Sequence, residues 1–185
     1  MKNKYKLIGI TGKARSGKDT IAKYLWQEYD FVRVSLAHPV KQAARIIFNL
    51  TYGQAFCDEL KEEVIPYWGL SPRQMFQKLG TDAVLCTFGQ MTWVKHWLQT
   101  YNTIYETDHV VVPDIRKDFE AEALLKLGGI IIEVRRGTGL AGETGRHTSE
   151  SGLETVIPHY VIDNHGTVDE LCRKVDSIMR SEERF

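Results

Sequence analysis

The apolar residues of the chain follow two kinds of pattern, which occur in turn along the sequence. Short unbroken apolar runs are typical of strands that are covered on both faces. Such runs predict strands over residues 7–10, 31–37, 109–112, 130–134 and 160–162. The residues between these runs mostly carry apolar side chains at three- and four-residue spacing, which predicts helices. These helices are expected from Lys18, from Val40 to Phe48, along an interrupted face from Met75 to Trp97, up to about Leu127, and after Thr167.

Local signals support several of these helix ends. Ser71-Pro72 is a typical helix start, and Thr167 with Glu170 forms a capping box. Gly128-Gly129 stops the preceding helix. Residues 51–70 follow no regular pattern. Strands that alternate with helices predict an α/β fold: a parallel five-stranded sheet with right-handed crossovers and helices on both faces. We expect one domain over residues 1–185, with a helical region at about 37–105.

Composition narrows the range of partners. The 185 residues hold 24 basic and 24 acidic side chains, so no overall field favours nucleic acid or an anionic membrane. The apolar runs are too short to span a bilayer. Cys57, Cys86 and Cys172 are scattered and lack metal-ligand spacing, which is typical of reduced thiols in a cytoplasmic protein. We therefore expect a cytoplasmic protein that acts on small molecules.

A glycine-rich turn separates the first strand from the first helix. It has the order and chemistry of a phosphate-binding loop, with backbone N–H groups, a helix N-terminus and an ammonium group that together bind a triphosphate. A serine or threonine usually follows the lysine as a magnesium ligand, whereas here an aspartate does, with a threonine next. The predicted nucleotide-binding residues are Gly12, Lys13, Ala14, Arg15, Ser16, Gly17, Lys18, Asp19 and Thr20.

Further candidates follow later strands, where ligands of parallel sheets bind. Asp114 ends a valine run at the position where triphosphatases order magnesium, and we favour this role over the alternative of a helix cap. Arg116 is a candidate phosphate ligand or a surface ion-pair partner. Residues 135–150 are rich in glycine and arginine, which predicts a mobile lid that carries Arg135, Arg136, Arg146 and His147 or, alternatively, an ordinary surface loop.

A second phosphate site is expected between the second and third strands. Its candidate ligands are Lys41, Arg73 and Gln77, each of which fits an ordinary solvated surface as well. A phosphotransferase would use such a site to hold an acceptor monophosphate.

Taken together, these motifs resemble those of the bacteriophage-type deoxynucleoside monophosphate kinases, which are P-loop kinases related to adenylate kinase. The shared segments span most of the chain and are residues 12–20, 35–41, 73–81, 114–120, 147–150 and 162–167. The resemblance implies a three-layer P-loop kinase fold and transfer of the γ-phosphoryl group of ATP to a deoxynucleoside monophosphate. It makes Asp19 a family feature rather than an anomaly.

The resemblance and the chemistry of the residues together predict roles for individual residues, and the phosphate contacts of Arg73, Arg116 and Arg146 are inferred from their chemistry alone. Lys18, Arg116, Arg135 and Arg146 would act in catalysis, and Thr20 and Asp114 would contact Mg²⁺. Arg135 or Arg136 would stack on adenine, and the loop with Asn164 and Gly166 would wrap the base. The acceptor would be bound by Lys41, Arg73, Gln77, Asp114, Arg116, His147 and Glu150.

Two other functions stay open on the sequence. One is a different small-molecule phosphate kinase, similar to phosphomevalonate kinase, which has a comparable loop. The other is a P-loop nucleotide switch that hydrolyses slowly. The sequence leaves a homodimer open, does not specify the base of the acceptor, and fits a phage or prophage gene product in a bacterial host.

Overall fold

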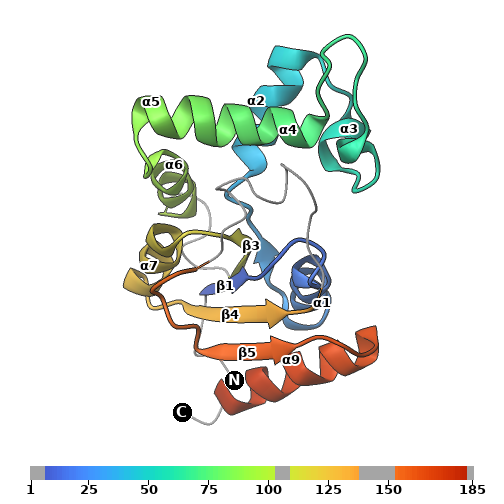
Figure 1. Cartoon of the computed structure of the whole chain (residues 1–185). Helices are drawn as coiled ribbons and strands as arrows, with labels where there is room; N and C mark the ends of the chain where they lie inside the picture. The colour runs from blue at the N-terminus through green and yellow to red at the C-terminus, as the bar shows by residue number, and fades with distance from the viewer. Residues whose placement is uncertain (1–6, 103–108, 138–152, 183–185) are drawn as a thin grey trace. The chain divides into compact units, whose positions relative to one another are not determined.

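The computed structural model describes residues 7–102, 109–137 and 153–182. The chain folds into two compact units (Figure 1). We call residues 1–35 with 97–185 the sheet unit, and residues 36–96 the helical unit.

Five parallel strands form the centre of the sheet unit. They are β1 (Leu7–Thr11), β2 (Val32–Arg33), β3 (Val110–Ile115), β4 (Ile130–Arg135) and β5 (Tyr160–Asp163). Their order in the sheet is β2-β3-β1-β4-β5, and every neighbouring pair is parallel. The predicted parallel five-stranded sheet is thus confirmed. Because all strands run the same way, the loops at their carboxyl ends lie along one edge of the sheet.

Helices cover both faces of this sheet. Successive side chains of a strand point to opposite faces, so Ile8 and Ile10 lie on one face of β1 and Gly9 on the other. A Cβ atom at Gly9 would lie 2.8 Å from Leu124 in α7 (Asp118–Lys126), so this helix packs directly against the strand. On the opposite face, the two isoleucines join a core with residues of α1 (Lys18–Tyr29) and α9 (Val168–Glu182), namely Ile21, Leu25, Leu171 and Val175. Three layers result, as expected (Figure 1).

β2 is shorter than the predicted strand over residues 31–37. The N–H group of Val34 still donates to the carbonyl oxygen of Val111 at 2.9 Å, but the chain then turns at Leu36–Ala37. The turn is followed by α2 (His38–Phe48), with Pro39 in its first turn. Proline suits that place because its missing N–H group would have no helical partner there. Helix formation therefore ends the strand early.

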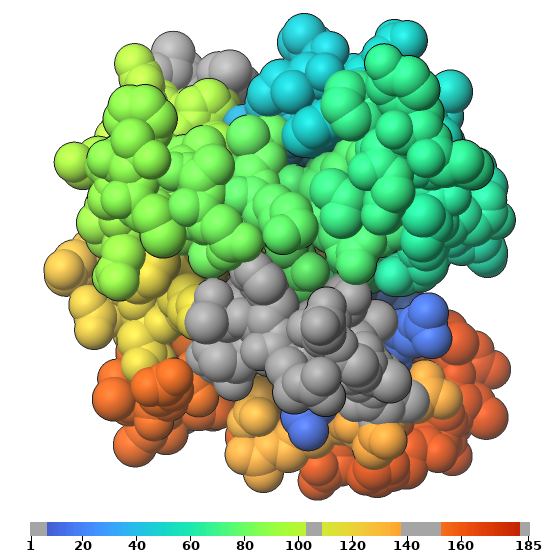
Figure 2. All heavy atoms as spheres, turned by 45° about the horizontal axis from the view of Figure 1, so that its top comes forward, coloured from blue at the N-terminus to red at the C-terminus, as the bar shows by residue number. Residues whose placement is uncertain are grey.

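The helical unit contains α2, α3 (Tyr52–Phe56), the 3₁₀ turn η1 (Leu60–Glu62), α4 (Pro72–Gln77), the π-helical stretch η2 (Lys78–Leu85), α5 (Cys86–Phe88) and the start of α6 (Thr92–Thr100). α4, η2 and α5 form one continuous helical run (Figure 1), and Gly89, with φ of 95°, ends it. A small core of Ala44, Leu50 and Met75 holds the unit together. In Figure 2 its atoms run from cyan to green.

Two helix starts in this unit show why prediction succeeded at one and failed at the other. Ser71 caps α4 as expected, accepting from the N–H group of Gln74 at 3.3 Å. Thr51 and Gln54 form the same capping box for α3, within a region that was expected to be irregular. The box was a readable signal, but five residues are too few to show an apolar period.

Candidate active site

The loop between β1 and α1 has the backbone shape of an anion cradle. Gly12, Arg15 and Gly17 have φ angles of 138°, 63° and 110°. These positive φ angles let successive backbone N–H groups point into one concavity, where an anion can bind. A Cβ atom at Gly12 would lie 2.3 Å from the carbonyl oxygen of Val134. Only glycine fits there, because the loop passes directly over the end of β4.

Lys18 begins α1 and lies inside this loop. Its Nζ atom donates to the carbonyl oxygens of Gly12 and Lys13, both at 2.7 Å, and the residue is only 9% exposed. The Ser16 hydroxyl is buried beside it and has no hydrogen-bond partner among the described residues. A buried ammonium and an unused buried hydroxyl are the groups that a phosphate would engage.

Asp114 lies at the carboxyl end of β3. Its Oδ2 atom accepts a hydrogen bond of 2.6 Å from the hydroxyl of Ser35, which follows β2. Ser35 was not among the predicted site residues, because the predicted strand over residues 31–37 included it, whereas the observed strand ends at Arg33. The structure therefore brings together groups from the ends of two neighbouring strands.

Arg116 and Glu120 complete the loop that follows Asp114. The Glu120 carboxylate accepts from the backbone N–H groups of Arg116 at 2.7 Å and Lys117 at 3.0 Å. Burial is the main reason why the pKa of Glu120 is raised to about 7; the nearby charge of Asp114 adds to this, and the two N–H donors oppose it. Glu120 thus fixes the backbone from which Asp114 and Arg116 project.

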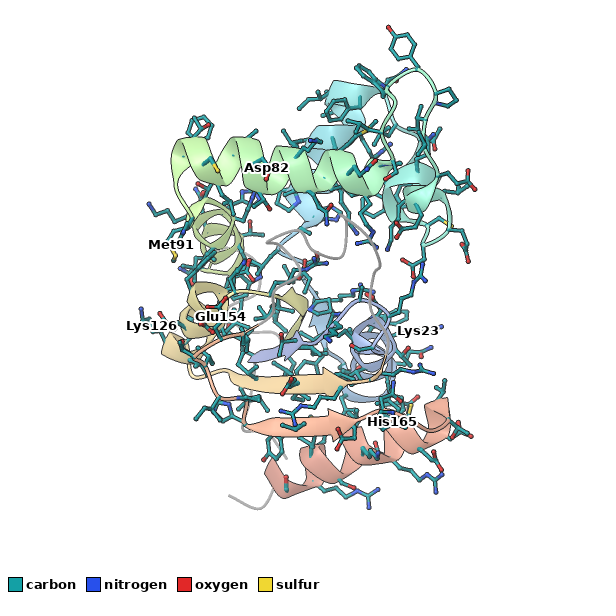
Figure 3. The ribbon with its side chains drawn as sticks, in the orientation of Figure 1. Lys23, Asp82, Met91, Lys126, Glu154 and His165 are labelled. Carbon is teal, nitrogen blue, oxygen red and sulfur yellow. The ribbon has the colours of Figure 1, made fainter. Side chains whose placement is uncertain are left out.

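Asp118, in the first turn of α7, holds the chain that leads to β5. Its carboxylate accepts from the N–H groups of Glu154, Thr155 and Val156 at 3.1, 3.0 and 3.1 Å, and from the Thr155 hydroxyl at 2.8 Å. Glu154 is labelled beside α7 in Figure 3. Burial alone would raise the pKa of Asp118, but these hydrogen bonds lower it.

The predicted arginine-bearing segment is described only at its start. Arg135 ends β4, and its Nη2 atom lies 2.8 Å from Glu133, whose hydrogen bond raises the pKa of the guanidinium. Arg136 is exposed. Arg146, His147 and Glu150 lie outside the described residues, so their roles and the lid stay predictions.

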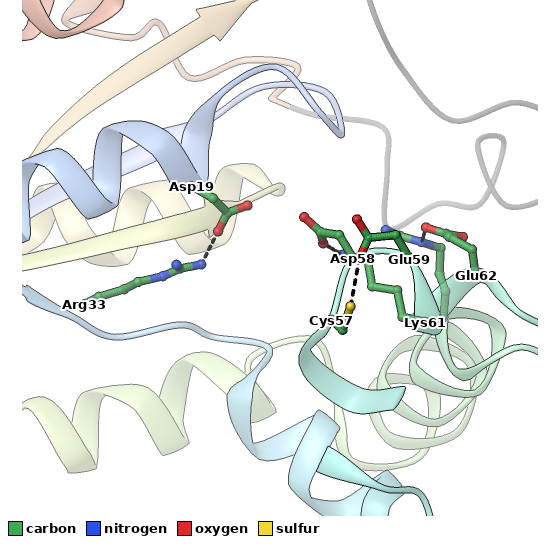
Figure 4. A network of polar contacts seen from close by, with 8 residues as sticks. Asp19, Arg33, Cys57, Asp58, Glu59, Lys61 and Glu62 are labelled. Carbon is green, nitrogen blue, oxygen red and sulfur yellow. Dashed lines mark hydrogen bonds and ion pairs between the residues drawn. The ribbon is translucent and has the colours of Figure 1, made fainter. Parts of the chain in front are cut away.

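Asn164 and Gly166 lie in the loop between β5 and α9. Asn164 is buried, and its side-chain amide donates to the carbonyl oxygen of Ser16 at 2.8 Å. Gly166 leaves room for the carboxylate of Glu170, which caps α9 by accepting from the N–H group of Thr167 at 2.9 Å. The predicted capping box is confirmed. Asp19, in the first turn of α1, forms an exposed ion pair with Arg33 of β2 (Figure 4).

Three of the candidate acceptor residues, Lys41, Arg73 and Gln77, lie in the helical unit. Arg73 donates from Nε to Glu62 at 2.7 Å and is mostly buried, and Gln77 is buried as well. The ammonium of Lys41 lies 5.4 Å from the centre of the Phe56 ring. The hydrogen bond from Lys61 is the main reason why the pKa of Asp58 is lowered, and the charges of Arg73 and Lys41 add to it.

Two of the acceptor candidates, Lys41 and Arg73, act on the same carboxylate, that of Asp58. The positive charges of Lys41, Lys61 and Arg73 all lower the pKa of Asp58, and we call these three residues the cation cluster. The carboxylates of Asp58 and Glu62 partly neutralise that cluster (Figure 4). Lys61 was not predicted.

The described part of the chain lacks two kinds of feature. No group of three or more histidine, cysteine, aspartate or glutamate side chains there is arranged to hold a metal ion. None of the helices described is long and apolar enough to cross a membrane. The three cysteines are free, as the scattered spacing predicted.

Solved structures with the same fold include a shikimate kinase. A crystal structure of TT1252 from Thermus thermophilus is 20% identical, covers 95% of this chain and 96% of its own, and gives a TM-score of 0.53. Shikimate kinase from Aquifex aeolicus is 12% identical, covers 97% and 98%, and gives 0.51. At these identities the likeness shows the fold alone, which is that of the P-loop kinases.

Sequence relatives are more specific. Deoxynucleotide monophosphate kinase of phage T4 is 29% identical over 244 aligned positions, covering 95% of this chain and 99% of the phage protein. That alignment is longer than the 185 residues of this chain, so the phage protein carries insertions. A protein of Acanthamoeba polyphaga mimivirus is 31% identical over 184 positions, covering 92% of this chain and 94% of its own.

The family model described as deoxynucleotide monophosphate kinase matches residues 6–65 and 50–175. These two matches include the phosphate loop, Asp114, the cation cluster of the helical unit and the Asn164 loop. The chain therefore belongs to the deoxynucleotide monophosphate kinase family.

Proposed function

We propose that this chain transfers the γ-phosphoryl group of ATP to a deoxynucleoside 5′-monophosphate, giving ADP and the deoxynucleoside diphosphate. The observation that carries the proposal is the phosphate loop with Lys18 buried inside it, in a member of this family. Phosphoryl transfer depends on positioning and on charge stabilisation rather than on a covalent protein intermediate. The residues of the site supply both.

The donor side of the proposal lies in the sheet unit. Residues 12–17 hold the β- and γ-phosphates through backbone N–H groups, and Lys18 exchanges the carbonyl oxygens of Gly12 and Lys13 for phosphate oxygens. This exchange keeps the ammonium hydrogen-bonded both without and with the nucleotide. Asn164 and Gly166 lie in the loop that would flank the adenine.

Two oxygen groups of the sheet unit fit a magnesium ion. Magnesium prefers hard oxygen ligands and keeps several waters, so the hydroxyl of Thr20 and the carboxylate of Asp114 would suffice. Ser35 occupies Oδ2 of Asp114 as a donor and thereby orients the carboxylate. When bound with ATP, the ion would neutralise the charge on the phosphate oxygens. Thr20 and Asp114 would hold it, directly or through water.

Arginines would stabilise the charge that develops on the transferred group. Arg116, Arg135 and Arg146 are the proposed residues, and Arg136 would lie against the adenine. Arg135 now binds Glu133, and its guanidinium is more than half exposed, so exchanging that partner for a phosphate needs no burial of a new charge.

The cation cluster proposed for the acceptor phosphate lies in the helical unit. A monophosphate carries nearly two negative charges at neutral pH, and the Lys41–Lys61–Arg73 cluster provides compensating charge on one unit. Gln77, His147 and Glu150 are the proposed polar contacts for the rest of the acceptor, together with Asp114 and Arg116. The curated relatives are viral, which supports a phage-type gene product acting in the cytoplasm of an infected cell.

A coupled assay of ADP release against a panel of monophosphates tests the proposal. We expect turnover with ATP only when a deoxynucleoside monophosphate is present, and the panel identifies its base. Turnover with phosphomevalonate, but with no nucleoside monophosphate, would mean that the acceptor is not a nucleotide. ATP hydrolysis that no monophosphate stimulates would instead indicate a nucleotide switch.

A further inference from the structure

Asn164 joins three parts of the sheet unit. Its backbone N–H group donates to the carbonyl oxygen of Arg135 at 2.8 Å, at the end of β4. Its side-chain Nδ2 atom donates to the carbonyl oxygen of Ser16, also at 2.8 Å, inside the phosphate loop. The residue is 5% exposed, and Ser16 is fully buried. A donor in this position is costly to remove, because the buried carbonyl would lose its partner.

The asparagine also packs on Gly17, the last residue before α1. A Cβ atom at Gly17 would lie 2.5 Å from Nδ2 of Asn164 and 3.2 Å from Cδ2 of Leu171. Gly17 therefore needs to be glycine for two reasons. Its φ of 110° disfavours a side chain, and the amide of Asn164 fills the space that a side chain would take.

Fixing the carbonyl of Ser16 also fixes the next N–H group. The carbonyl of Ser16 and the N–H of Gly17 belong to one planar trans peptide group, so they point in opposite directions. Asn164 binds the carbonyl end of this plane and rests against Gly17. The N–H of Gly17 is therefore turned away from Asn164, in a loop whose N–H groups are suited to phosphate.

We propose that Asn164 is a positioning residue that aims the N–H group of Gly17 at the donor phosphates by holding the carbonyl of Ser16. The inference rests on the proposed function and refines it: the side-chain amide of Asn164 acts on the phosphate loop rather than on the adenine. Through Asn164, the loop of His165 and Gly166, where Figure 3 labels His165, is tied mechanically to the phosphate loop. Base binding and phosphate binding are then coupled.

Two substitutions separate this role from base recognition. Asn164→Asp keeps the size of the side chain but replaces the amide donor by a carboxylate oxygen, which faces the Ser16 carbonyl and cannot donate to it. Asn164→Ala removes the donor without adding a charge, and it serves if the aspartate variant does not fold. Met179→Ala is the matched control, because it removes a buried side chain of the same core in the last turns of α9.

Binding is measured by calorimetry or by competition, with a non-hydrolysable ATP analogue and with adenosine. We expect both Asn164 variants to bind the ATP analogue about tenfold more weakly or worse, and adenosine within about twofold of wild type. The acceptor KM should not change, and hydrogen exchange of the residue 12–17 amides should become faster. Met179→Ala should lower thermal stability and leave the ratio of the two affinities unchanged.

Three results would overturn the inference. An equal loss for the ATP analogue and adenosine would mean that Asn164 reads the base. Unchanged affinities would leave the hydrogen bond without a role in binding, and a loss matched by Met179→Ala would make it a general stability effect. Failure of the proposed function is distinguishable, because wild-type protein would then show no monophosphate-dependent turnover.

Discussion

The hydroxyl of Ser35 donates a hydrogen bond of 2.6 Å to Oδ2 of Asp114. The two residues are far apart in sequence and meet because β2 and β3 are neighbours in the sheet. A charge-assisted bond of this kind fixes the carboxylate in one rotamer. The carboxylate of Asp114 is therefore held in a defined orientation at the end of β3.

Removing this donor should weaken the response to magnesium. A hydrogen bond to a charged group contributes about 1.5–3 kcal/mol, so Ser35→Ala should lower kcat/KM by tenfold or more at limiting Mg²⁺. Saturating Mg²⁺ should restore part of the loss. Ser35→Thr keeps the hydroxyl and is the control. A magnesium titration of the steady-state rate checks this, and identical curves for alanine and wild type would contradict it.

Lys18→Ala should abolish transfer without unfolding the protein. The ammonium interacts with loop carbonyls and not with the apolar core, so circular dichroism should be unchanged. We expect a loss of roughly a thousandfold in kcat, about 4 kcal/mol of transition-state stabilisation. Lys18→Arg retains the charge but not the shape of the donor. Near-normal turnover of the alanine variant would remove the phosphate-loop assignment.

Arg73→Ala should affect only the acceptor. Because Arg73 belongs to the cation cluster of the helical unit, the ATP KM should stay nearly constant. A charge-assisted contact contributes roughly 2–3 kcal/mol, so kcat/KM for the monophosphate should fall about thirtyfold to a hundredfold. Lys78→Ala, one exposed charge further along the same helical run, is the control. The measurement varies each substrate in turn, and a change in the ATP KM alone would contradict the assignment.

Glu120 should make folding stability depend on pH. Its pKa rises from 4.5 in the unfolded chain to about 7 in the folded one, so the folded state binds the proton more tightly. This contribution is fully present below the unfolded pKa and is lost as the pH rises from about 4.5 through 7. The two limits differ by about 3 kcal/mol. Urea unfolding of wild type and Glu120→Gln at pH 4.5 and pH 8 checks it, since the difference between the proteins should change with pH by that amount. A constant difference would mean that Glu120 titrates normally.

The strands and the phosphate loop were predictable because their signals are local. The run from Leu7 to Thr11 is buried throughout, and its unbroken apolar character shows that both faces are covered. The backbone of the loop requires glycine at positions with positive φ angles, and these glycines can be recognised in the sequence. Helix caps at Ser71 and Thr167 were readable for the same reason.

Pairings across the sheet could not be predicted from the sequence. Ser35 and Asp114 meet only because β2 lies beside β3, and Asn164 reaches Ser16 across 148 positions of sequence. The family resemblance placed Asn164 in the loop that wraps the base. It could not show that the side-chain amide of Asn164 donates a hydrogen bond to the backbone carbonyl of Ser16. Glu62 was missed as the partner of Arg73, since the two lie eleven positions apart and the chain between them is mostly irregular.

Asp118 has a consequence for how the chain tolerates change. By binding three successive N–H groups at Glu154, Thr155 and Val156, it holds the approach to β5 in place, while β4 holds the chain at Arg135. Both attachments belong to the sheet unit, one on each side of the interval between Gly137 and Leu153. The free energy of closing a segment between fixed ends grows slowly with its length, by about 0.6 kcal/mol for each doubling. Insertions between Gly137 and Leu153 should therefore leave the sheet intact, even where they disturb the proposed catalytic role of Arg146.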